Sequence, residues 1–486
     1  MYIRNEDTIC APATVPGTGA ISVIRVSGPE SLAIADKVIT CRKGNISGAK
    51  GYSIKFGTVS DTSGAVIDEV LVSVFRAPYS YTGENSVEIS CHASSYIVSA
   101  VMDLLYAAGA RAAEPGEFTQ RAFLNGKMDL AQAEAVADVI ASQNAAAHRI
   151  AFKQMKGGFS SELRDMRQEL LELVSLMELE LDFSEEEVEF ADRTRLDSLL
   201  SALVDHITRL IDSFKLGNAI KNGVPVAIAG ATNTGKSTLL NALLGEDRAI
   251  VSDVHGTTRD TVEETLNIDG ILFRFIDTAG LRETEEIVEK IGIERTFKKI
   301  SEASVVLGMI DLTRDHESTC KTIGEIINKV DFKSQKLVFL LNKTDICEVN
   351  KNVNTINYIV SSLSNKGIKD TQSESPETSA DETQIIPISA KTGSGINILR
   401  SVLASSQRNL LADSDTTLVT NQRHVQALAD ARTSLLRCRD GLLTGLPTDL
   451  ASQDIREAIY NLGSIVGEIS TDEVLGNIFA NFCIGK

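Results

Sequence analysis

The sequence predicts a multidomain α/β protein in which a doubly wound α/β domain is inserted into a helical domain, behind a small N-terminal α+β domain. Short apolar runs alternate with helical patterns between Lys221 and about Ser406, as in a parallel sheet flanked by helices. Helical periodicity precedes this stretch and returns after about Asn421. The 486 residues suffice for about three domains.

The domain boundaries follow from these changes of pattern. We expect the N-terminal α+β domain at 1–122, the helical domain in two parts at 123–218 and 409–486, and the inserted domain at 219–408. In the first helical part, three- and four-residue spacing predicts a core-facing stripe of Leu163, Met166, Leu170, Leu173, Val174, Met177 and Leu181. In the second part, the predicted apolar face is Val425, Leu428, Ala429, Leu435 and Leu436.

The most informative stretch of the inserted domain is Gly230-Ala-Thr-Asn-Thr-Gly-Lys-Ser237. It lies between an apolar run and a helical pattern, which is the strand–loop–helix context of a phosphate-binding loop. Glycines let the backbone close around an anion so that its N–H groups point inward. Lys236 would reach the β- and γ-phosphates in a catalytic role, and Ser237 would ligate Mg²⁺. The nucleotide contacts expected here are Asn233, Thr234, Gly235, Lys236, Ser237 and Thr238.

Three further motifs follow in the order that a GTPase requires. Asp277-Thr278-Ala279-Gly280 ends an apolar run, where the Asp holds Mg²⁺ through water and the glycine N–H senses the γ-phosphate. Asn342-Lys343-Thr344-Asp345 ends another, and its last carboxylate can accept two hydrogen bonds from guanine that adenine cannot supply. Ser389-Ala390-Lys391 would offer a backbone amide to the guanine O6. An ATPase or a coincidental loop is the alternative, but four ordered motifs predict GTP binding and hydrolysis.

The segment between the phosphate loop and Asp277 indicates how hydrolysis is assisted. Thr258 is the candidate second Mg²⁺ ligand, on a switch loop that orders around the γ-phosphate. Leu281 stands where Ras-like GTPases carry a water-positioning glutamine, and an aliphatic side chain cannot orient water by hydrogen bonding. Asn233 and carbonyls of the loop at 252–257 are therefore candidates to hold a monovalent cation. The alternative is a slow GTPase that awaits an external activator.

Several motifs spread over nearly the whole chain are shared with one known family. In the inserted domain they are Gly256-Thr-Thr-Arg-Asp260 and Asp277-Thr-Ala-Gly-Leu-Arg282, and the chain ends with Phe482-Cys-Ile-Gly-Lys486. The N-terminal matches are Asp7–Thr14, Ile24–Pro29, Ala77–Glu84 and Glu114–Ala135. With these motifs the chain resembles the MnmE (TrmE) family of tRNA modification GTPases. Two loops depart from the family pattern, because Gly17-Thr-Gly-Ala20 replaces Gly-Arg-Gly-Gly and His92 precedes Ala-Ser instead of Gly-Gly.

The resemblance implies a homodimeric, potassium-stimulated GTPase whose nucleotide domains close on each other during turnover. The implied potassium ligands are Asn233, Ser252, Val254 and Thr257, with Ser252 and Val254 binding through their carbonyls. Glu289 matches the catalytic acid of the family and would act on the attacking water through a bridging water. From spacing alone, Glu289 would be interpreted as a solvated glutamate of a switch helix.

The resemblance also implies an N-terminal site for a tetrahydrofolate derivative, in its 5,10-methylene or 5-formyl form. The matching contacts are Arg25, Glu84 and Lys127, with the terminal Lys486 close by. Cations suit the glutamate carboxylates of folate, and Glu84 suits the hydrogen-bond donor edge of its ring. Cys483 could add as a thiolate to an electron-poor ring or an iminium, or lie near the folate without a covalent role.

The net charge of −18, without a basic stripe, predicts weak intrinsic affinity for tRNA. The resemblance identifies the partner that supplies most tRNA contacts as the FAD-binding subunit MnmG (GidA), in a heterotetramer. Seven scattered cysteines without Cys-x-x-Cys, and no leader or long apolar run, favour a cytoplasmic protein without a membrane segment. The polar segment from Glu348 to about Thr383 is expected to be a surface loop in its middle, with no catalytic role.

These patterns together predict the GTPase component of an enzyme that adds a carboxymethylaminomethyl or aminomethyl group to C5 of wobble uridine in certain tRNAs. The nitrogen would come from glycine or ammonium. A ribosome-assembly or signalling GTPase of the Era type is the alternative, but it gives no reason for Arg25, Glu84, Lys127 or the C-terminal Cys-Ile-Gly-Lys. A folate-binding scaffold with vestigial nucleotide binding is disfavoured by the intact Lys236 and Asp277.

Overall fold

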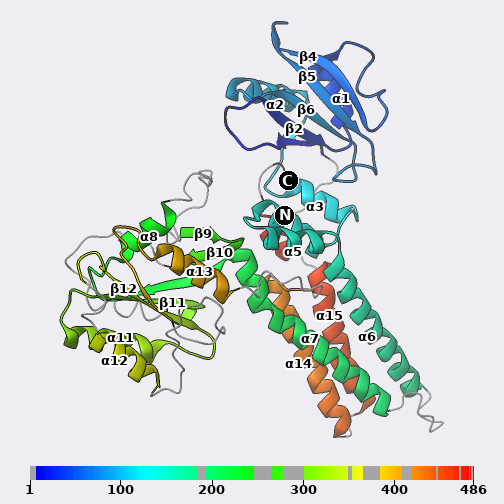
Figure 1. The fold of residues 1–486 in the computed structure, drawn as a ribbon. Coiled ribbons are helices and arrows are strands. Elements are labelled where there is room, and N and C mark those ends of the chain that lie inside the picture. Colours follow the sequence, from blue (N-terminus) through cyan, green and yellow to red (C-terminus); the bar gives the residue numbers. More distant parts are fainter. Residues whose placement is uncertain are drawn as a thin grey trace. The chain divides into compact units, whose positions relative to one another are not determined.

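The computed structural model divides the chain into two compact units (Figure 1). The first comprises Met1–Ala141, Ala151–Ile211 and Gln422–Lys486, and the second Ser142–Ile150 and Asp212–Asn421. No helix in the described parts of the chain combines the length and apolar character needed to cross a bilayer. The residues described are 7–182, 193–245, 264–276, 300–347, 353–364, 384–407, 417–444, 447–469, 472–480, 482 and 485.

The N-terminal part of the first unit is a seven-stranded sheet with the order β3-β4-β5-β6-β2-β1-β7. Its pairs are antiparallel except for β1 and β7, which run parallel. Helices α1 (Ser31–Val38) and α2 (Ser95–Ala108) pack on one face, where alternate strand residues are apolar and buried. The strands are β1 (Ile9–Pro12), β2 (Ile21–Ser27), β3 (Ile39–Cys41), β4 (Ser53–Ser60), β5 (Val66–Phe75), β6 (Ser86–His92) and β7 (Arg111–Ala112).

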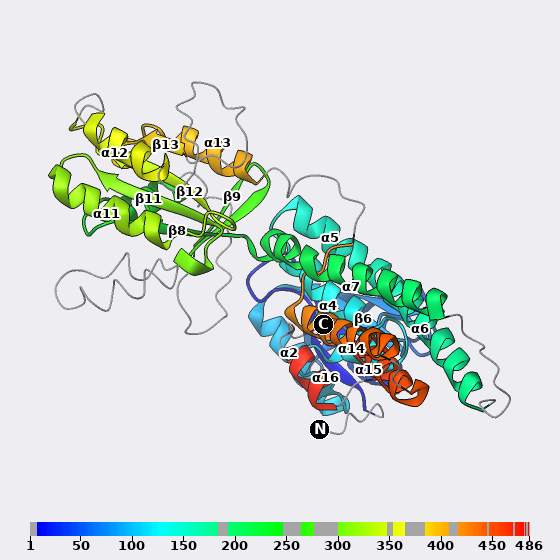
Figure 2. The same cartoon turned by 90° about the horizontal axis from the view of Figure 1, so that it is seen from below.

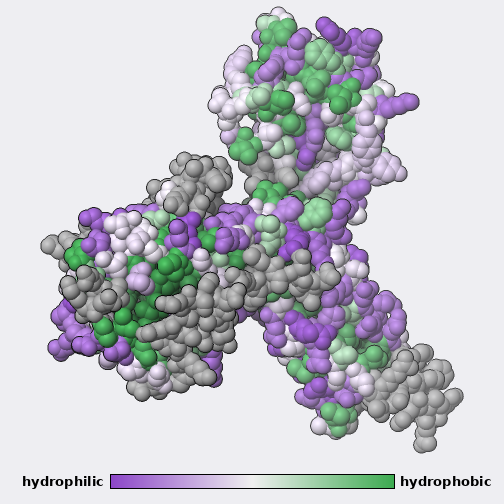
Figure 3. All heavy atoms as spheres, viewed as in Figure 1, coloured by the Kyte–Doolittle hydropathy of each residue, from purple (hydrophilic) through white to green (hydrophobic). Residues whose placement is uncertain are grey.

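The opposite face of this sheet carries exposed apolar side chains. Phe56 and Leu71 are direct cross-strand neighbours of β4 and β5, and 36% and 49% of their surface is exposed. Ile54 and Ile21 are also exposed. Apolar and hydrophilic residues are interspersed over the visible side of this domain (Figure 3).

The helical part of the first unit packs α15 between α14 and α6 (Figures 1 and 2). The stripe predicted on α6 is confirmed, because Leu163, Met166, Leu170, Leu173, Val174 and Met177 are all buried. The side chain of Leu181 lies outside the described residues. The helices of this part are α3 (Glu117–Leu124), α4 (Leu130–Ala141), α6 (Gly158–Asp182), α14 (Gln422–Leu443), α15 (Thr448–Val466) and α16 (Asp472–Phe479). Helices α5 (Ala145–Met155) and α7 (Arg193–Asn222) each have residues in both units.

The apolar face predicted for α14 is only partly correct. Leu428 and Leu435 are buried, but Val425, Ala429 and Leu436 are only half-buried. Three non-aliphatic side chains share the buried face with Leu428 and Leu435. These side chains are His424, which pairs with Glu134, Ser434, which donates to the Asp430 carbonyl, and Cys438.

The second unit contains a six-stranded sheet with the order β13-β12-β11-β8-β10-β9. Alternate strand residues enter two cores, one with α8 (Lys236–Leu244) and α13 (Ile396–Ser406), the other with α11 (His316–Lys329) and α12 (Val353–Ser364). Helices on both faces of a largely parallel sheet make the doubly wound fold that the sequence predicts. The strands are β8 (Val224–Ala229), β9 (Glu264–Ile268), β10 (Ile271–Phe275), β11 (Val305–Asp311), β12 (Lys336–Asn342) and β13 (Gln384–Pro387).

Strand β9 departs from the expected parallel sheet, because it pairs antiparallel with β10. The two strands are joined by Asp269 and Gly270, which have φ values of 51° and 84°. A two-residue turn with positive φ at both positions is the preferred hairpin connection, and it forces the antiparallel pairing. In the polar segment 348–383, residues Val353–Ser364 form α12, and 365–383 lie outside the described residues.

Candidate functional site

The phosphate loop of the second unit lies between β8 and α8. Asn233 has a left-handed backbone with a φ of 61°, and Gly235 precedes α8 with a φ of 96°. A side chain at Gly235 would collide with Asn342, because a Cβ there would lie 2.5 Å from the side-chain amide nitrogen. Thr234 is buried and donates to the carbonyl of Ala231 over 2.9 Å. The loop therefore has the tight, glycine-dependent geometry that close approach to a phosphate requires.

Lys236 lies over this loop. Its ammonium group donates to the carbonyls of Gly230 and Ala231 over 3.0 and 2.8 Å. Burial lowers the pKa of Lys236, and the positive charge of Arg314 lowers it further. Ser237 follows in the first turn of α8, and Thr238 is exposed. An incoming phosphate would replace the two carbonyls as the partner of this cation.

The three motifs Gly-x4-Gly-Lys-Ser, Asn-Lys-x-Asp and Ser-Ala-Lys meet around Asn342. Its side-chain nitrogen donates to the carbonyl of Thr234 over 2.7 Å, and its side-chain oxygen accepts from the N–H of Ala390 over 2.9 Å. Ser389 donates to the carboxylate of Asp345 over 2.8 Å. The structure thus brings together residues that the sequence places in three separate motifs, and Lys391 follows them at an exposed position.

Two contacts near the loop involve residues that sequence reasoning did not select. Asp311, at the end of β11, accepts from the ammonium of Lys343 over 2.7 Å, and Lys343 has a left-handed φ of 71°. Burial raises the pKa of Asp311, but hydrogen bonds from Lys343 and Thr313 outweigh it and hold the pKa below its ordinary value. Arg314 donates to the carbonyl of Thr232. The sequence could have indicated Asp311, because it follows the apolar run 305–310. The carboxyl ends of strands face ligands in such sheets.

Several predicted residues lie outside the described part of the chain. Ile276 is the last described residue before the Asp277 motif, and its N–H donates to the carbonyl of Val226 in β8 over 2.9 Å. The predicted residues of the second unit that lie outside are Ser252, Val254, Thr257, Thr258, Asp277, Thr278, Ala279, Gly280 and Glu289. Cys483 and Lys486 in the first unit also lie outside.

A second candidate site lies in the first unit, around Arg25 on β2. The Arg25 guanidinium pairs with Glu88 over 2.8 Å and lies 5.2 Å from the ring centre of Tyr81 and 5.6 Å from that of Phe118. One of its terminal nitrogens also donates to the carbonyl of Gly485 over 3.4 Å. A cation framed by aromatic rings is suited to a planar, anionic ligand.

Residues next to the C-terminus lie against the same strands. Gly485 is buried, and a Cβ on it would lie 2.2 Å from the carbonyl oxygen of Pro12 in β1. Its φ of 95° and this close approach both require glycine. The structure therefore brings Gly485 of the C-terminal Cys-Ile-Gly-Lys motif to the N-terminal sheet, whereas Cys483 and Lys486 lie outside the described residues.

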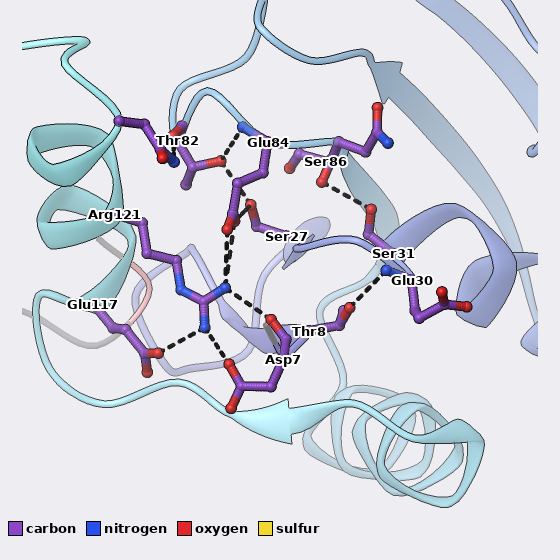
Figure 4. Close-up of polar contacts among 12 residues, drawn as sticks. Asp7, Thr8, Ser27, Glu30, Ser31, Thr82, Glu84, Ser86, Glu117 and Arg121 are labelled. Atoms are coloured by element: carbon purple, nitrogen blue, oxygen red, sulfur yellow. Dashed lines mark hydrogen bonds and ion pairs between the residues drawn. The ribbon is translucent and has the colours of Figure 1, made fainter. Parts of the chain in front are cut away.

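Glu84 and Lys127 flank this site. The Glu84 carboxylate accepts from Ser27 over 2.7 Å and from Arg121 over 3.1 Å (Figure 4). Lys127 is exposed and donates to the carbonyl of Pro78 over 3.0 Å. Arg121 was not predicted, because its three carboxylate partners are Asp7, Glu84 and Glu117, two of them far away in the sequence.

The strand order, the phosphate loop and the motifs that meet at Asn342 define the chain as a multidomain P-loop GTPase. Two family models match it, "GTP-binding protein TrmE N-terminus" over residues 8–127 and "MnmE helical domain" over residues 130–483. The chain belongs to the MnmE family of tRNA modification GTPases, and it is a GTP hydrolase.

The relatives support this assignment over the full length of the chain. The chain is 51% identical to a tRNA modification GTPase MnmE of Bacteroides thetaiotaomicron, over 99% of this chain and 100% of that protein. It is 49% identical to the MnmE of Flavobacterium johnsoniae, over 99% of this chain and 100% of that protein. The identities extend across both units, so the N-terminal and helical parts are shared as well as the nucleotide domain.

Proposed function

We propose that this chain is a potassium-stimulated GTPase that acts with an FAD-binding partner to modify C5 of the wobble uridine in certain tRNAs. The added group is carboxymethylaminomethyl or aminomethyl, and its one-carbon unit comes from a tetrahydrofolate derivative bound to the first unit. The observation that carries this proposal is the full-length relationship to MnmE proteins, and the contact between Arg25 and Gly485 supports it.

GTP recognition would use the residues that meet at Asn342. The Asp345 carboxylate, held by Ser389, would accept from the guanine N1–H and amino group, and a backbone N–H of the Ser389-Ala390-Lys391 motif would donate to O6. Lys236 neutralises the β- and γ-phosphates, whereas Mg²⁺ is held by Ser237 and Thr258 with Asp277 acting through water. The backbone around Thr278, Ala279 and Gly280 then senses the γ-phosphate.

Hydrolysis would depend on a potassium ion, because Leu281 cannot orient water. The ion would bind the Asn233 side chain and oxygens of Ser252, Val254 and Thr257, and would place its charge where the transition state becomes more negative. The exposure of Asn233 within the phosphate loop supports this role, since its side-chain oxygen is accessible to a cation. Glu289 would act on the attacking water through a second water.

The folate would lie near Arg25 in the first unit. Arg25, Lys127 and Lys486 suit its carboxylates, and Glu84 suits the paired N–H donors of its pterin ring. The aromatic rings of Tyr81 and Phe118 beside Arg25 fit a planar ligand. When bound, the folate supplies the one-carbon unit, and Cys483 would lie beside it because Gly485 contacts Arg25.

The remaining chemistry requires partners. The redox step needs a cofactor on another subunit, for which we propose an FAD-binding protein of the MnmG type, and the net charge of −18 leaves most tRNA contacts to that subunit. We also propose a homodimer. The exposed apolar side chains Phe56 and Leu71 on the open sheet face support a contact between two copies.

The proposal is tested by mass spectrometry of tRNA nucleosides from cells depleted of this protein and complemented with either the wild-type chain or the Lys236→Ala variant. We expect 5-carboxymethylaminomethyl-type uridines to disappear on depletion and to return only with the wild-type chain. Unchanged nucleosides on depletion would contradict the proposal and favour an assembly GTPase of the Era type.

A further inference from the structure

Arg121, on α3, has a guanidinium without solvent exposure that is surrounded by three carboxylates (Figure 4). Its terminal nitrogens lie 2.6 Å from Asp7, 3.0 Å from Glu117 and 3.1 Å from Glu84. A buried guanidinium is costly unless it is paired, and the paired terminal nitrogens fix these three carboxylates in position. The Nε of Arg121 has no partner among the described residues.

A second guanidinium, that of Arg111, shares two of these carboxylates. It lies 2.8 Å from Asp7 and 2.6 Å from Glu117, and 44% of the side chain is exposed. Within the described residues, Arg121 bonds Glu84 and Arg111 does not. The cluster thus contains two guanidiniums and three carboxylates, which leaves one negative charge in excess. Glu84 is the carboxylate that contacts one guanidinium instead of two.

Ser27 and Arg121 are the described side chains that donate to Glu84. Ser27 donates to Oε2 over 2.7 Å, and Arg121 donates to Oε1 over 3.1 Å and to Oε2 over 3.4 Å. The Glu84 side chain is 12% exposed, and the side chain of Lys127 passes beside the neighbouring Gly83. Oε1 accepts one of these hydrogen bonds and keeps acceptor capacity for a ligand, since a carboxylate oxygen can accept two.

We propose that Arg121 is a positioning residue that holds the Glu84 carboxylate in the orientation that meets the N–H donors of a pterin ring. This role rests on the folate site proposed above. Without Arg121, the Glu84 carboxylate would lose the donor that fixes it from α3 and would keep Ser27 as its donor among the described side chains. A carboxylate that can turn away would lose its contact with the ring donors.

The role is tested with two ligands on the full-length chain by calorimetry. One is 5-formyltetrahydrofolate, and the other is its 2-desamino-2-methyl analogue, which lacks one of the two ring donors. For Arg121→Met and Arg121→Lys we expect the affinity for 5-formyltetrahydrofolate to fall about tenfold or more, while the affinity for the analogue changes little. The wild-type preference for the amino ligand therefore shrinks. Arg111→Met is the matched control and keeps the preference, because Arg111 does not contact Glu84.

Each other outcome contradicts a stated part of the inference. An equal loss for both ligands in Arg121→Lys, or the same loss of preference in Arg111→Met, would overturn the positioning role and leave the folate site intact. Absence of binding by the wild-type chain would overturn the folate site and this role with it. GTP hydrolysis by the second unit and the circular dichroism spectrum show whether each variant is folded. If Arg121→Met does not fold, the binding data for the milder Arg121→Lys variant decide.

Discussion

The side-chain nitrogen of Asn342 donates a 2.7 Å hydrogen bond to the carbonyl of Thr234, 108 positions away in the sequence. The oxygen of the same amide accepts from the N–H of Ala390, and Asn342 is 3% exposed. One buried amide therefore connects the phosphate loop with the loop expected to contact guanine O6. We expect phosphate and base recognition to depend on the same pair of hydrogen bonds.

The substitution Asn342→Asp should uncouple these two parts. A carboxylate has the same shape but no donor for Thr234, and its charge would be buried against a carbonyl. We expect the nucleotide domain to lose about 2 kcal/mol of stability and the affinity for GTP to fall about tenfold or more. Thermal unfolding and binding of a fluorescent GTP analogue measure both effects.

The matched control for this prediction is Asn222→Asp. Asn222 is exposed and donates only to the side chain of Asn218 among the bonds described for it. We expect nearly unchanged stability and affinity in this variant. If the two variants have equal stability and affinity for GTP, the two hydrogen bonds of the Asn342 side chain do not connect phosphate and base recognition.

The potassium role predicts a selective effect of Asn233→Gly. Glycine keeps the left-handed backbone at a φ of 61° without strain but removes the side-chain oxygen. We expect the wild-type chain to hydrolyse GTP at least about tenfold faster in KCl than in NaCl, and the variant to lose this difference while still binding GTP. Single-turnover hydrolysis in the two salts measures it. Asp269→Gly, at a left-handed position of the β9–β10 turn, controls for the backbone change. Equal wild-type rates in KCl and NaCl would exclude the potassium site.

The sequence predicts contacts well where they follow from strand order, and poorly where charges meet by tertiary packing. Asn342, Asp345 and Ala390 follow strand ends of one parallel sheet, so their convergence is a consequence of the topology. Arg121 offered no such signal, because its partners come from the N-terminus, the loop before β6 and its own helix. The buried face of α14 was predicted only in part for the same reason. His424 lies on that face and pairs with Glu134, which is far away in the sequence.

Glu134 in the helical part of the first unit predicts a dependence of stability on pH. Its carboxylate lies 2.6 Å from His424 and 3.0 Å from Arg423. Burial raises the pKa of Glu134, but the charges and hydrogen bonds of His424 and Arg423 outweigh it and lower the pKa from 4.5 to about 2. Because the folded pKa is depressed, the stabilisation is present above about pH 4.5 and is lost as the pH falls towards 2.

A shift of this size corresponds to about 3 kcal/mol. We expect Glu134→Gln to be less stable than the wild type at pH 7, with a difference that shrinks between pH 5 and pH 3. Urea unfolding followed by helical circular dichroism measures it. Glu172→Gln, at an exposed position of α6, should leave the wild-type pH profile unchanged. A constant difference between Glu134→Gln and the wild type across this range would show that the pair does not link folding to protonation.

The last prediction concerns the contact between Gly485 and the N-terminal sheet. In Gly485→Ala, the new Cβ would lie 2.2 Å from the Pro12 carbonyl at a φ of 95°, so the C-terminal segment must leave its place beside Arg25. If Cys483 and Lys486 act at the folate site, this shift should lower tRNA modification at least about tenfold. GTP hydrolysis should stay within about twofold of the wild-type rate, because the phosphate loop belongs to the other unit.

Gly476→Ala separates this effect from a general sensitivity of the C-terminal region. Gly476 lies within α16, where a Cβ would meet no atom within 4 Å, and alanine favours a helix over glycine by about 1 kcal/mol. This variant should modify tRNA as the wild type does. Nucleoside analysis of complemented cells reports the modification, and phosphate release by the purified chains reports hydrolysis. Normal modification by Gly485→Ala would show that the C-terminal segment is not needed at the Arg25 site, and a parallel loss of hydrolysis would show that the substitution acts on the whole chain.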